Sequence, residues 1–185
     1  GSRLAVSTQS GAVSLWDIPG RKELARVQNE MIVTALAWSP GAKTIAWADA
    51  LGSLVFAEGS SGREPLRFQS RGAGITALQF PPDGHSLLSL DRRGTLLSWK
   101  DELGREPLRI ATGEGQVTTM SCSPDGSWLA LASGSALRLH PLGRSGRVVE
   151  FTGHRKAITS LAFSPNGTEL LRGGVDPTTL VWRVP

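Results

Sequence analysis

Short stretches in which apolar and polar residues alternate recur along the whole chain. In residues 33–38, Val33, Ala35 and Ala37 alternate with Thr34, Leu36 and Trp38, and a β-branched residue opens each similar stretch. A period of two is typical of strands that bury one face. No window of a dozen residues combines helical periodicity with capping residues. The pattern therefore predicts an all-β protein.

The predicted strands come in groups of four separated by turn signals. The first strand of a group leads to a Pro-x-Gly turn, with Pro-Asp-Gly at 82–84 and 124–126 and Pro-Asn-Gly at 165–167. Proline presets φ, Asp or Asn bonds its own backbone, and glycine accepts a positive φ. An apolar strand such as 128–132 follows, and then a strand that ends in Trp16, Trp99 or Trp182. The fourth strand of each group is more polar, at residues 24–27, 65–68, 107–110 and 148–151.

Two independent landmarks keep one period along the chain. The turn prolines lie at positions 40, 82, 124 and 165, at intervals of 42, 42 and 41. The ends of the tryptophan strands lie at 16, 57, 99, 140 and 182, with Ala57 and His140 in two degenerate copies. Four antiparallel strands repeated every 41–42 residues predict the blades of a β-propeller.

The repeat also resembles the WD40 repeat. The last copy carries the motif most fully, as Gly153-His154, Ser164-Pro165-Asn166-Gly167, Asp176 and Trp182, and residues 16–17 form a literal Trp-Asp pair. The resemblance implies that His154, Asp176 and Trp182 belong to a structural hydrogen-bond network. Other positions depart from the family pattern: Arg172 or Gly174 stands at the place of the Ser/Thr, Arg93 at the place of an Asp, and His140 and Ala57 at the place of a Trp.

The fold class that follows is an all-β, WD40-type propeller with about three complete four-stranded blades and two partial ones. We expect a single domain over residues 1–185, with blade parts at 3–28, 31–70, 74–112, 116–152 and 157–185. The first blade is expected to lack its innermost strand and the last its outermost strand, so the ring is incomplete. Open strand edges favour pairing with other strands. We therefore expect a segment of a larger propeller, or one chain of an assembled ring, and favour the segment.

Composition limits the class of protein further. The 185 residues carry a net charge of +4, with 39% hydrophobic and 19% charged residues, as in a globular protein. The one cysteine excludes a disulfide framework and a Cys-x-x-Cys metal site. The sequence shows no signal-peptide pattern and no apolar run of the roughly 18 residues that a membrane span needs. These features predict an intracellular, cytoplasmic protein without a membrane partner.

Residues with catalytic potential do not converge in the repeat. His85, His140 and His154 occupy different repeat positions, so we expect neither a metal site nor a cofactor. Cys122 lies on an innermost strand, where it is expected to be a small buried hydrophobic residue. The glycine-rich stretches 72–74 and 113–115 do not precede a helix, so they lack the geometry of a phosphate loop. We therefore do not expect an enzyme.

The remaining hypothesis is a non-catalytic protein–protein interaction scaffold. Its partner would be a protein or peptide, a second copy, or the remainder of a parent propeller. The expected polar contacts lie on the face formed by the blade connections: Arg71, Arg92, Arg93, Arg155 and Lys156. One alternative is the regulatory propeller of a larger signalling enzyme whose catalytic domain lies outside this chain. A weaker alternative is nucleic-acid binding, which the absence of any block of five or six like charges disfavours.

Overall fold

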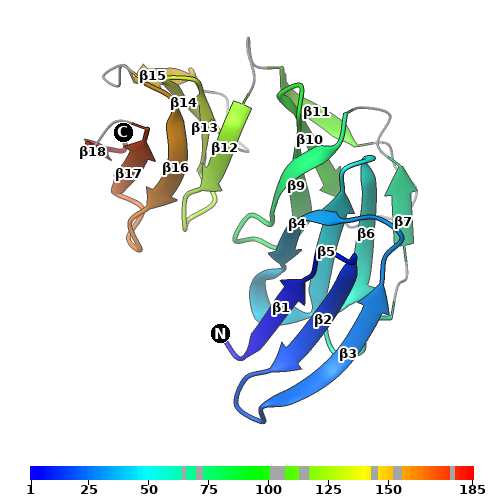
Figure 1. The fold of residues 1–185 in the computed structure, drawn as a ribbon. Helices are drawn as coiled ribbons and strands as arrows, with labels where there is room; N and C mark the ends of the chain where they lie inside the picture. The colour runs from blue at the N-terminus through cyan, green and yellow to red at the C-terminus, as the bar shows by residue number, and fades with distance from the viewer. Residues whose placement is uncertain are drawn as a thin grey trace.

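The computed structural model describes residues 1–63, 66–69, 73–100, 107–112, 117–142, 146–151, 156–175 and 178–185. Within them the chain forms 18 strands in five antiparallel sheets of three, four, four, four and three strands (Figure 1). Consecutive strands pair in every sheet, so each sheet is a meander. The prediction of an all-β fold with three complete and two partial blades is confirmed.

Each sheet is here called a blade, numbered 1–5 along the chain, and its strands are lettered a to d from the inside outward. Blade 1 has strands b, c and d, which are β1 (Arg3–Ser7), β2 (Ala12–Asp17) and β3 (Lys22–Gln28). Blade 2 has β4 (Val33–Trp38), β5 (Thr44–Asp49), β6 (Ser53–Glu58) and β7 (Leu66–Gln69). Blade 3 has β8 (Ile75–Gln79), β9 (Ser86–Asp91), β10 (Thr95–Lys100) and β11 (Leu108–Thr112).

Blades 4 and 5 complete the series. Blade 4 has β12 (Val117–Cys122), β13 (Trp128–Ser133), β14 (Ala136–Pro141) and β15 (Val149–Phe151). Blade 5 has strands a, b and c, which are β16 (Ile158–Phe163), β17 (Glu169–Gly174) and β18 (Thr179–Arg183). The innermost strands β4, β8, β12 and β16 lie next to one another in chain order.

The a–b turns use the residues that the sequence pattern marked. Gly84, Gly126 and Gly167 have φ values of 69°, 73° and 74°, in the left-handed region that glycine enters without a steric penalty. The equivalent turn of blade 2 is a single 3-10 turn, Pro40–Ala42, in which Gly41 has φ 78°. These turns gather at one end of the strands, and the b–c turns at the other end.

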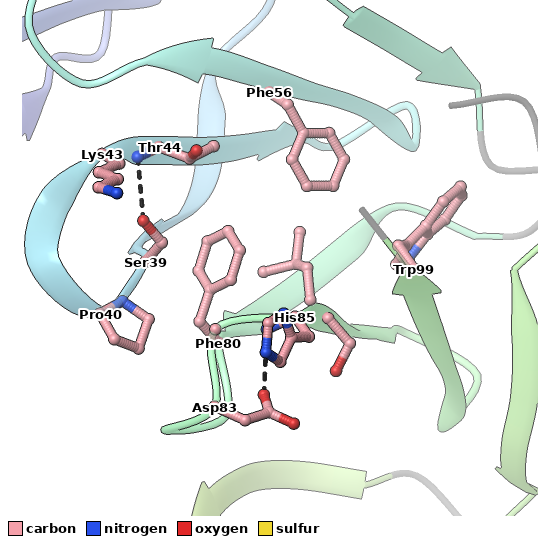
Figure 2. A pocket seen from close by; sticks show the side chains of 12 residues that line it. Ser39, Pro40, Lys43, Thr44, Phe56, Phe80, Asp83, His85 and Trp99 are labelled. Atoms are coloured by element: carbon pink, nitrogen blue, oxygen red, sulfur yellow. Dashed lines mark hydrogen bonds between the residues drawn. The ribbon is translucent and has the colours of Figure 1, made fainter. Parts of the chain in front are cut away.

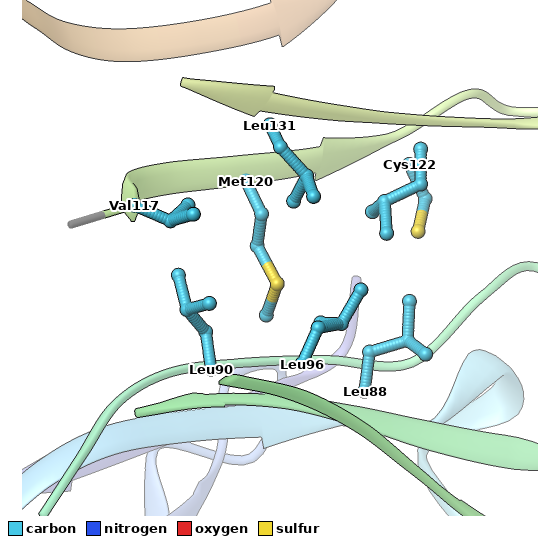
Figure 3. Close-up of a cluster of buried hydrophobic side chains, with 8 residues drawn as sticks. Leu88, Leu90, Leu96, Val117, Met120, Cys122 and Leu131 are labelled. Atoms are coloured by element: carbon cyan, nitrogen blue, oxygen red, sulfur yellow. The ribbon is translucent and has the colours of Figure 1, made fainter. Parts of the chain in front are cut away.

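The core lies between blades, because the b strands bury both of their faces. On β5, Ile45 and Trp47 pack toward blade 1, whereas Ala46 and Ala48 pack toward blade 3. Similar apolar clusters join blades 3 and 4 (Figure 3) and blades 4 and 5. Apolar side chains on both faces of a strand explain why the b strands read as continuous apolar runs.

Every a strand carries an irregularity at its second residue. The register shifts between Val33 and Ala35 in blade 2, and at the same place in blades 3, 4 and 5. The skipped residue is a threonine each time. The Thr34 hydroxyl donates to the carbonyl oxygens of Ala48 at 3.2 Å and Ile75 at 2.5 Å, and Ile75 belongs to the next blade. At the bulge of blade 2, the threonine hydroxyl therefore forms a hydrogen bond to the next blade.

Candidate functional site

The face that carries the predicted partner contacts is built from the b–c turns and the d–a connections. In blade 3 the Asp91 carboxylate fixes the b–c turn, because its Oδ1 accepts the backbone N–H groups of Arg93 and Thr95, both at 2.8 Å. Asp49 does the same in blade 2, where Oδ1 accepts the N–H groups of Leu51 and Ser53 at 3.0 Å. Both aspartates are buried. The turns are therefore held from inside, and their tips face solvent.

Arg92 and Arg93 occupy the tip of the blade 3 turn and are exposed. The backbone N–H of Arg92 donates to the carbonyl oxygen of Gly74 at 3.1 Å, which ties the turn to the d–a connection beside it. Within the described residues, neither guanidinium makes a hydrogen bond or an ion pair. Two adjacent arginines on a braced turn are thus available for a partner.

The other predicted contacts are only partly described. Lys156 is exposed and is separated by one residue from the innermost strand of blade 5, on the same face as Arg92 and Arg93. Arg71 and Arg155 lie outside the described residues.

Of the predicted WD40-like network, only Trp182 is described, since His154 and Asp176 lie outside the described residues. The bond that such a network implies is present in blade 3, where the indole Nε1 of Trp99 donates to the Ser89 hydroxyl at 2.7 Å. Trp99 is 6% exposed and packs into the apolar cluster between blades 2 and 3. The predicted packing of Trp99 between blades is confirmed.

Strand register shows what replaces this pair in the other blades. In blade 3, Trp99 pairs with Leu87 on strand b, and Ser89 follows Leu87 by two residues on that strand. In blade 2, Ala57 is at the position of Trp99 and pairs with Ile45. Trp47 follows Ile45 by two residues and is therefore at the position of Ser89. Blade 2 therefore has its tryptophan on strand b and its small residue on strand c, the reverse of blade 3.

Blade 5 uses a third arrangement. Trp182 lies opposite Leu170, which identifies Arg172, and not Gly174, as the residue at the serine position. The Arg172 guanidinium is fully buried and lies 5.2 Å from the Trp182 ring centroid, within cation–π range. Trp182 also contacts Phe151 of blade 4, with ring centroids 5.0 Å apart, which confirms its predicted place between blades.

Groups with catalytic potential are separated in the structure. Among the described residues, no three of the His, Cys, Asp and Glu side chains are grouped to hold a metal ion. Burial, and to a lesser extent the charge of Asp83, raises the pKa of the Cys122 thiol to about 12. The nucleophile is the thiolate, so this cysteine is unreactive at neutral pH. Burial, followed by the nearby charge of Arg138, lowers the pKa of His140.

The sequence pattern places Asp49 and Asp91 in the b–c turns, but it does not predict that their carboxylates brace these turns. The family pattern expects the aspartate six residues before the end of the tryptophan strand, where Arg93 stands. The signal that marks them is their separation of 42 residues, the repeat period. The exchange of Trp47 with Ala57 was also overlooked, although both residues are visible at the equivalent places.

Three findings relate this chain to known proteins. The family model "WD domain, G-beta repeat" (WD40) matches residues 105–138 and 145–183. A stretch of 34 residues is 53% identical to POC1 centriolar protein homolog A of Danio rerio, covering 18% of this chain and 8% of that protein. The crystal structure of the Cps50 (Swd1) β-propeller domain of Myceliophteria thermophila superposes with a TM-score of 0.85 at 17% identity, over 100% of this chain and 62% of that one. At that identity the likeness concerns the fold.

The chain thus spans less than two thirds of the solved propeller and a small part of the fish protein. Among the described residues no helix is long and apolar enough to cross a membrane.

Proposed function

The chain is built of WD40-type β-propeller blades, and we propose that it serves as a non-catalytic scaffold that binds a protein or peptide partner. The observation that carries the proposal is the Arg92–Arg93 pair, exposed at the tip of a turn that Asp91 braces from within. Arginine is effective at interfaces because its planar fork pairs bidentately with carboxylates and stacks on aromatic rings. A rigid turn also reduces the side-chain and backbone ordering that binding requires.

The partner surface extends over neighbouring connections in this proposal. Lys156 is the described contact on blade 5, and Arg71 and Arg155 are proposed from the sequence alone. An intracellular, cytoplasmic location goes with this role, and the name of the fish relative, a centriolar protein, supports it. The partners include the blades of a parent propeller or a second copy, since the outer faces of blades 1 and 5 carry exposed apolar residues.

The test is a double charge reversal, Arg92→Glu with Arg93→Glu, followed by quantitative affinity capture against the unmodified chain. We expect the specific partners to be lost while the free energy of unfolding changes by no more than about 0.5 kcal/mol, because both side chains are exposed. The matched control is Arg21→Glu with Lys22→Glu, another adjacent, exposed basic pair, which ends a c–d turn and begins β3 at the opposite end of the strands.

Three outcomes would contradict the proposal. Equal loss of folding and binding would show that Arg92 and Arg93 are structural. Equal loss of partners in the control would show a non-specific effect of charge. Capture of nucleic acid, with an affinity that falls steeply as salt rises, would support the nucleic-acid alternative instead.

A further inference from the structure

A cavity lies at the a–b turn end of blades 2 and 3, the end opposite to the Arg92–Arg93 turn. It has a volume of about 310 Å³ (Figure 2). Its inner walls are apolar or small side chains: Thr44, Phe56, Phe80, Leu87 and Trp99. Exposed residues, among them Lys43, Asp83 and His85, form its mouth. Ligand pockets start at about 300 Å³, so this one has room for a single large side chain.

The junction between blades 4 and 5 repeats most of the cavity's apolar surroundings, with Leu139 at the place of Phe56. Trp99 lies opposite Leu87 in blade 3, as Trp182 lies opposite Leu170 in blade 5. Each indole contacts a phenylalanine ring of the preceding blade in a tilted arrangement. The Phe68–Trp99 centroids are 5.4 Å apart at 50°, and the Phe151–Trp182 centroids are 5.0 Å apart at 55°.

The remaining positions correspond as well. Phe80 and Phe163 occupy the same repeat position, five residues after Ile75 and Ile158. Ala46 and Ala48 of blade 2 match Ala130 and Ala132 of blade 4. These alanines lie in the apolar clusters of their own junctions. The two junctions therefore share most of the side chains that surround this space.

The first residue of strand b also differs between the two junctions. Thr44 pairs with Glu58 at the start of β5, and Trp128 pairs with Pro141 at the start of β13, so the two residues are equivalent. Trp128 packs against the cluster between blades 4 and 5 and fills its space with an indole. Thr44 leaves the corresponding space between blades 2 and 3 open as the cavity.

We propose that this cavity binds the tryptophan side chain of a partner protein. Most of the walls that hold an indole in the junction of blades 4 and 5 are present here without the indole, and Phe56 adds an aromatic wall where that junction has Leu139. Tryptophan also suits a site with an apolar interior and a polar mouth, because its N–H needs an acceptor. The Asp83 carboxylate supplies one at the mouth: its Oδ1 accepts the backbone N–H of His85 at 3.1 Å, and a carboxylate has further lone pairs.

None of the tryptophans within residues 1–185 supplies this side chain. All six tryptophans of this chain are described, and each is buried or half-buried, so none is free to enter a second copy. Only the identity of the donor, a partner protein, rests on the proposed scaffold function. The cavity and its preference for indole stand on the comparison of the two junctions.

The test uses N-acetyl-5-fluorotryptophanamide as the probe and its fluorine NMR line as the readout. The unmodified chain should broaden and shift the line, with a dissociation constant on the order of 1 mM, as expected of one side chain. Thr44→Trp copies Trp128 and should weaken probe binding by at least about tenfold. Glu169→Trp is the matched control, because Glu169 pairs with Arg183 at the same register position of blade 5 and is exposed. This control should bind the probe as the unmodified chain does.

Melting curves of all variants establish folding, and Thr44→Phe gives a smaller filling residue if Thr44→Trp does not fold. No binding to the unmodified chain, or equal binding after Thr44 is enlarged, would overturn the proposal. Equal binding of N-acetylleucinamide would overturn the preference for indole. Self-association that Thr44→Trp abolishes would point to a second copy as the occupant. None of these results alters the Arg92–Arg93 test, which probes the other face.

Discussion

The tryptophan position of strand c and the neighbouring position of strand b are occupied by different residues in different blades. Blade 3 pairs Trp99 with Ser89 through a hydrogen bond of 2.7 Å. In blade 2 the indole belongs to Trp47 on strand b and Ala57 stands at the strand c position, and among the described residues the Trp47 N–H has no acceptor. A buried donor without a partner costs about 1–3 kcal/mol, so the apolar packing of the ring must offset that cost in blade 2.

The first prediction concerns Trp99. Trp99→Ala should lower the free energy of unfolding by about 3–5 kcal/mol, because it empties a site where the side chain is 6% exposed. Ser89→Ala should cost about 1 kcal/mol, since only the acceptor of the indole N–H is lost. Urea denaturation with unchanged m values measures both. Trp182→Ala should cost less than Trp99→Ala because Trp182 is only half-buried; the reverse order would contradict this account.

The second prediction concerns the a–b turns of blades 4 and 5. The hydroxyl of Ser123, followed by that of Ser127, holds the pKa of Asp125 at about 2, below its usual value of 3.8. A folded-state pKa below the unfolded one stabilises the fold above about pH 4, and this contribution is lost as the pH falls toward 2. Asn166 occupies the same turn position in blade 5, where its Oδ1 accepts the hydroxyl of Thr168 at 2.9 Å and carries no charge.

Asp125→Asn should therefore flatten the stability profile between about pH 4 and pH 2, and Asn166→Asp should steepen it. Both side chains are exposed, so the effects should be small and should shrink further at high salt. Urea midpoints at several pH values measure them. A profile that Asp125→Asn leaves unchanged would show that the hydroxyl bonds do not favour the carboxylate.

At the scale of the element, the threonine bulge joins neighbouring blades. Thr118 repeats the bonds of Thr34, donating to the carbonyl oxygens of Ala132 at 3.3 Å and of Ile158 in the next blade at 3.0 Å. Among the described residues, Thr76 bonds only within its own blade, to the carbonyl oxygen of Leu90 at 3.2 Å. The junction of blades 3 and 4 has a different link, the side chain of Gln79 bonded to the backbone N–H of Cys122 at 3.2 Å.

The third prediction follows from this difference. Thr34→Val and Thr118→Val should each lower the free energy of unfolding by about 1 kcal/mol more than Thr76→Val, because each also removes a bond to the next blade. Valine keeps the β-branched shape at a strand position, so the hydroxyl is the main loss. Urea denaturation compares the three variants. Equal effects at all three positions would show that the contacts between blades contribute nothing beyond the bond within each blade.

The strands and turns were predictable because their signals are local. Alternation, Pro-x-Gly and the period of 42 residues each depend on a few neighbouring residues, and they located the a–b turns at Gly84, Gly126 and Gly167. The cavity was not predictable in this way. It depends on whether Thr44 or a residue like Trp128 fills a space bounded by two blades, which only strand register reveals. The role of Asp91 was missed for a similar reason, since its partners are backbone groups across a turn.

At the scale of the whole molecule, the two terminal blades carry the exposed apolar faces. On β1 the alternation leaves Leu4 48% and Val6 41% exposed, on the side away from blade 2. On β18 Val181 is 55% exposed, on the side away from blade 4. These two strands lie in different end blades of the series (Figure 1). Between successive blades, by contrast, faces of this kind are buried in a core cluster at each of the junctions.

The last prediction is that these faces associate. Each belongs to an edge strand that pairs on one side only, and unpaired strand edges beside apolar side chains favour pairing with another chain. Sedimentation equilibrium of the chain should show a mass that rises with concentration above 19.6 kDa. Val6→Lys with Val181→Lys should suppress the rise, because lysine on an edge strand opposes pairing. Ile32→Lys is the matched control, since Ile32 is 55% exposed but lies outside the strands, and it should associate as the unmodified chain does.

If the faces match, association stops at a closed ring; if they do not, the contact is head-to-tail and the mass continues to grow. A monomer of constant mass at high concentration would show that the faces of β1 and β18 tolerate water without a partner.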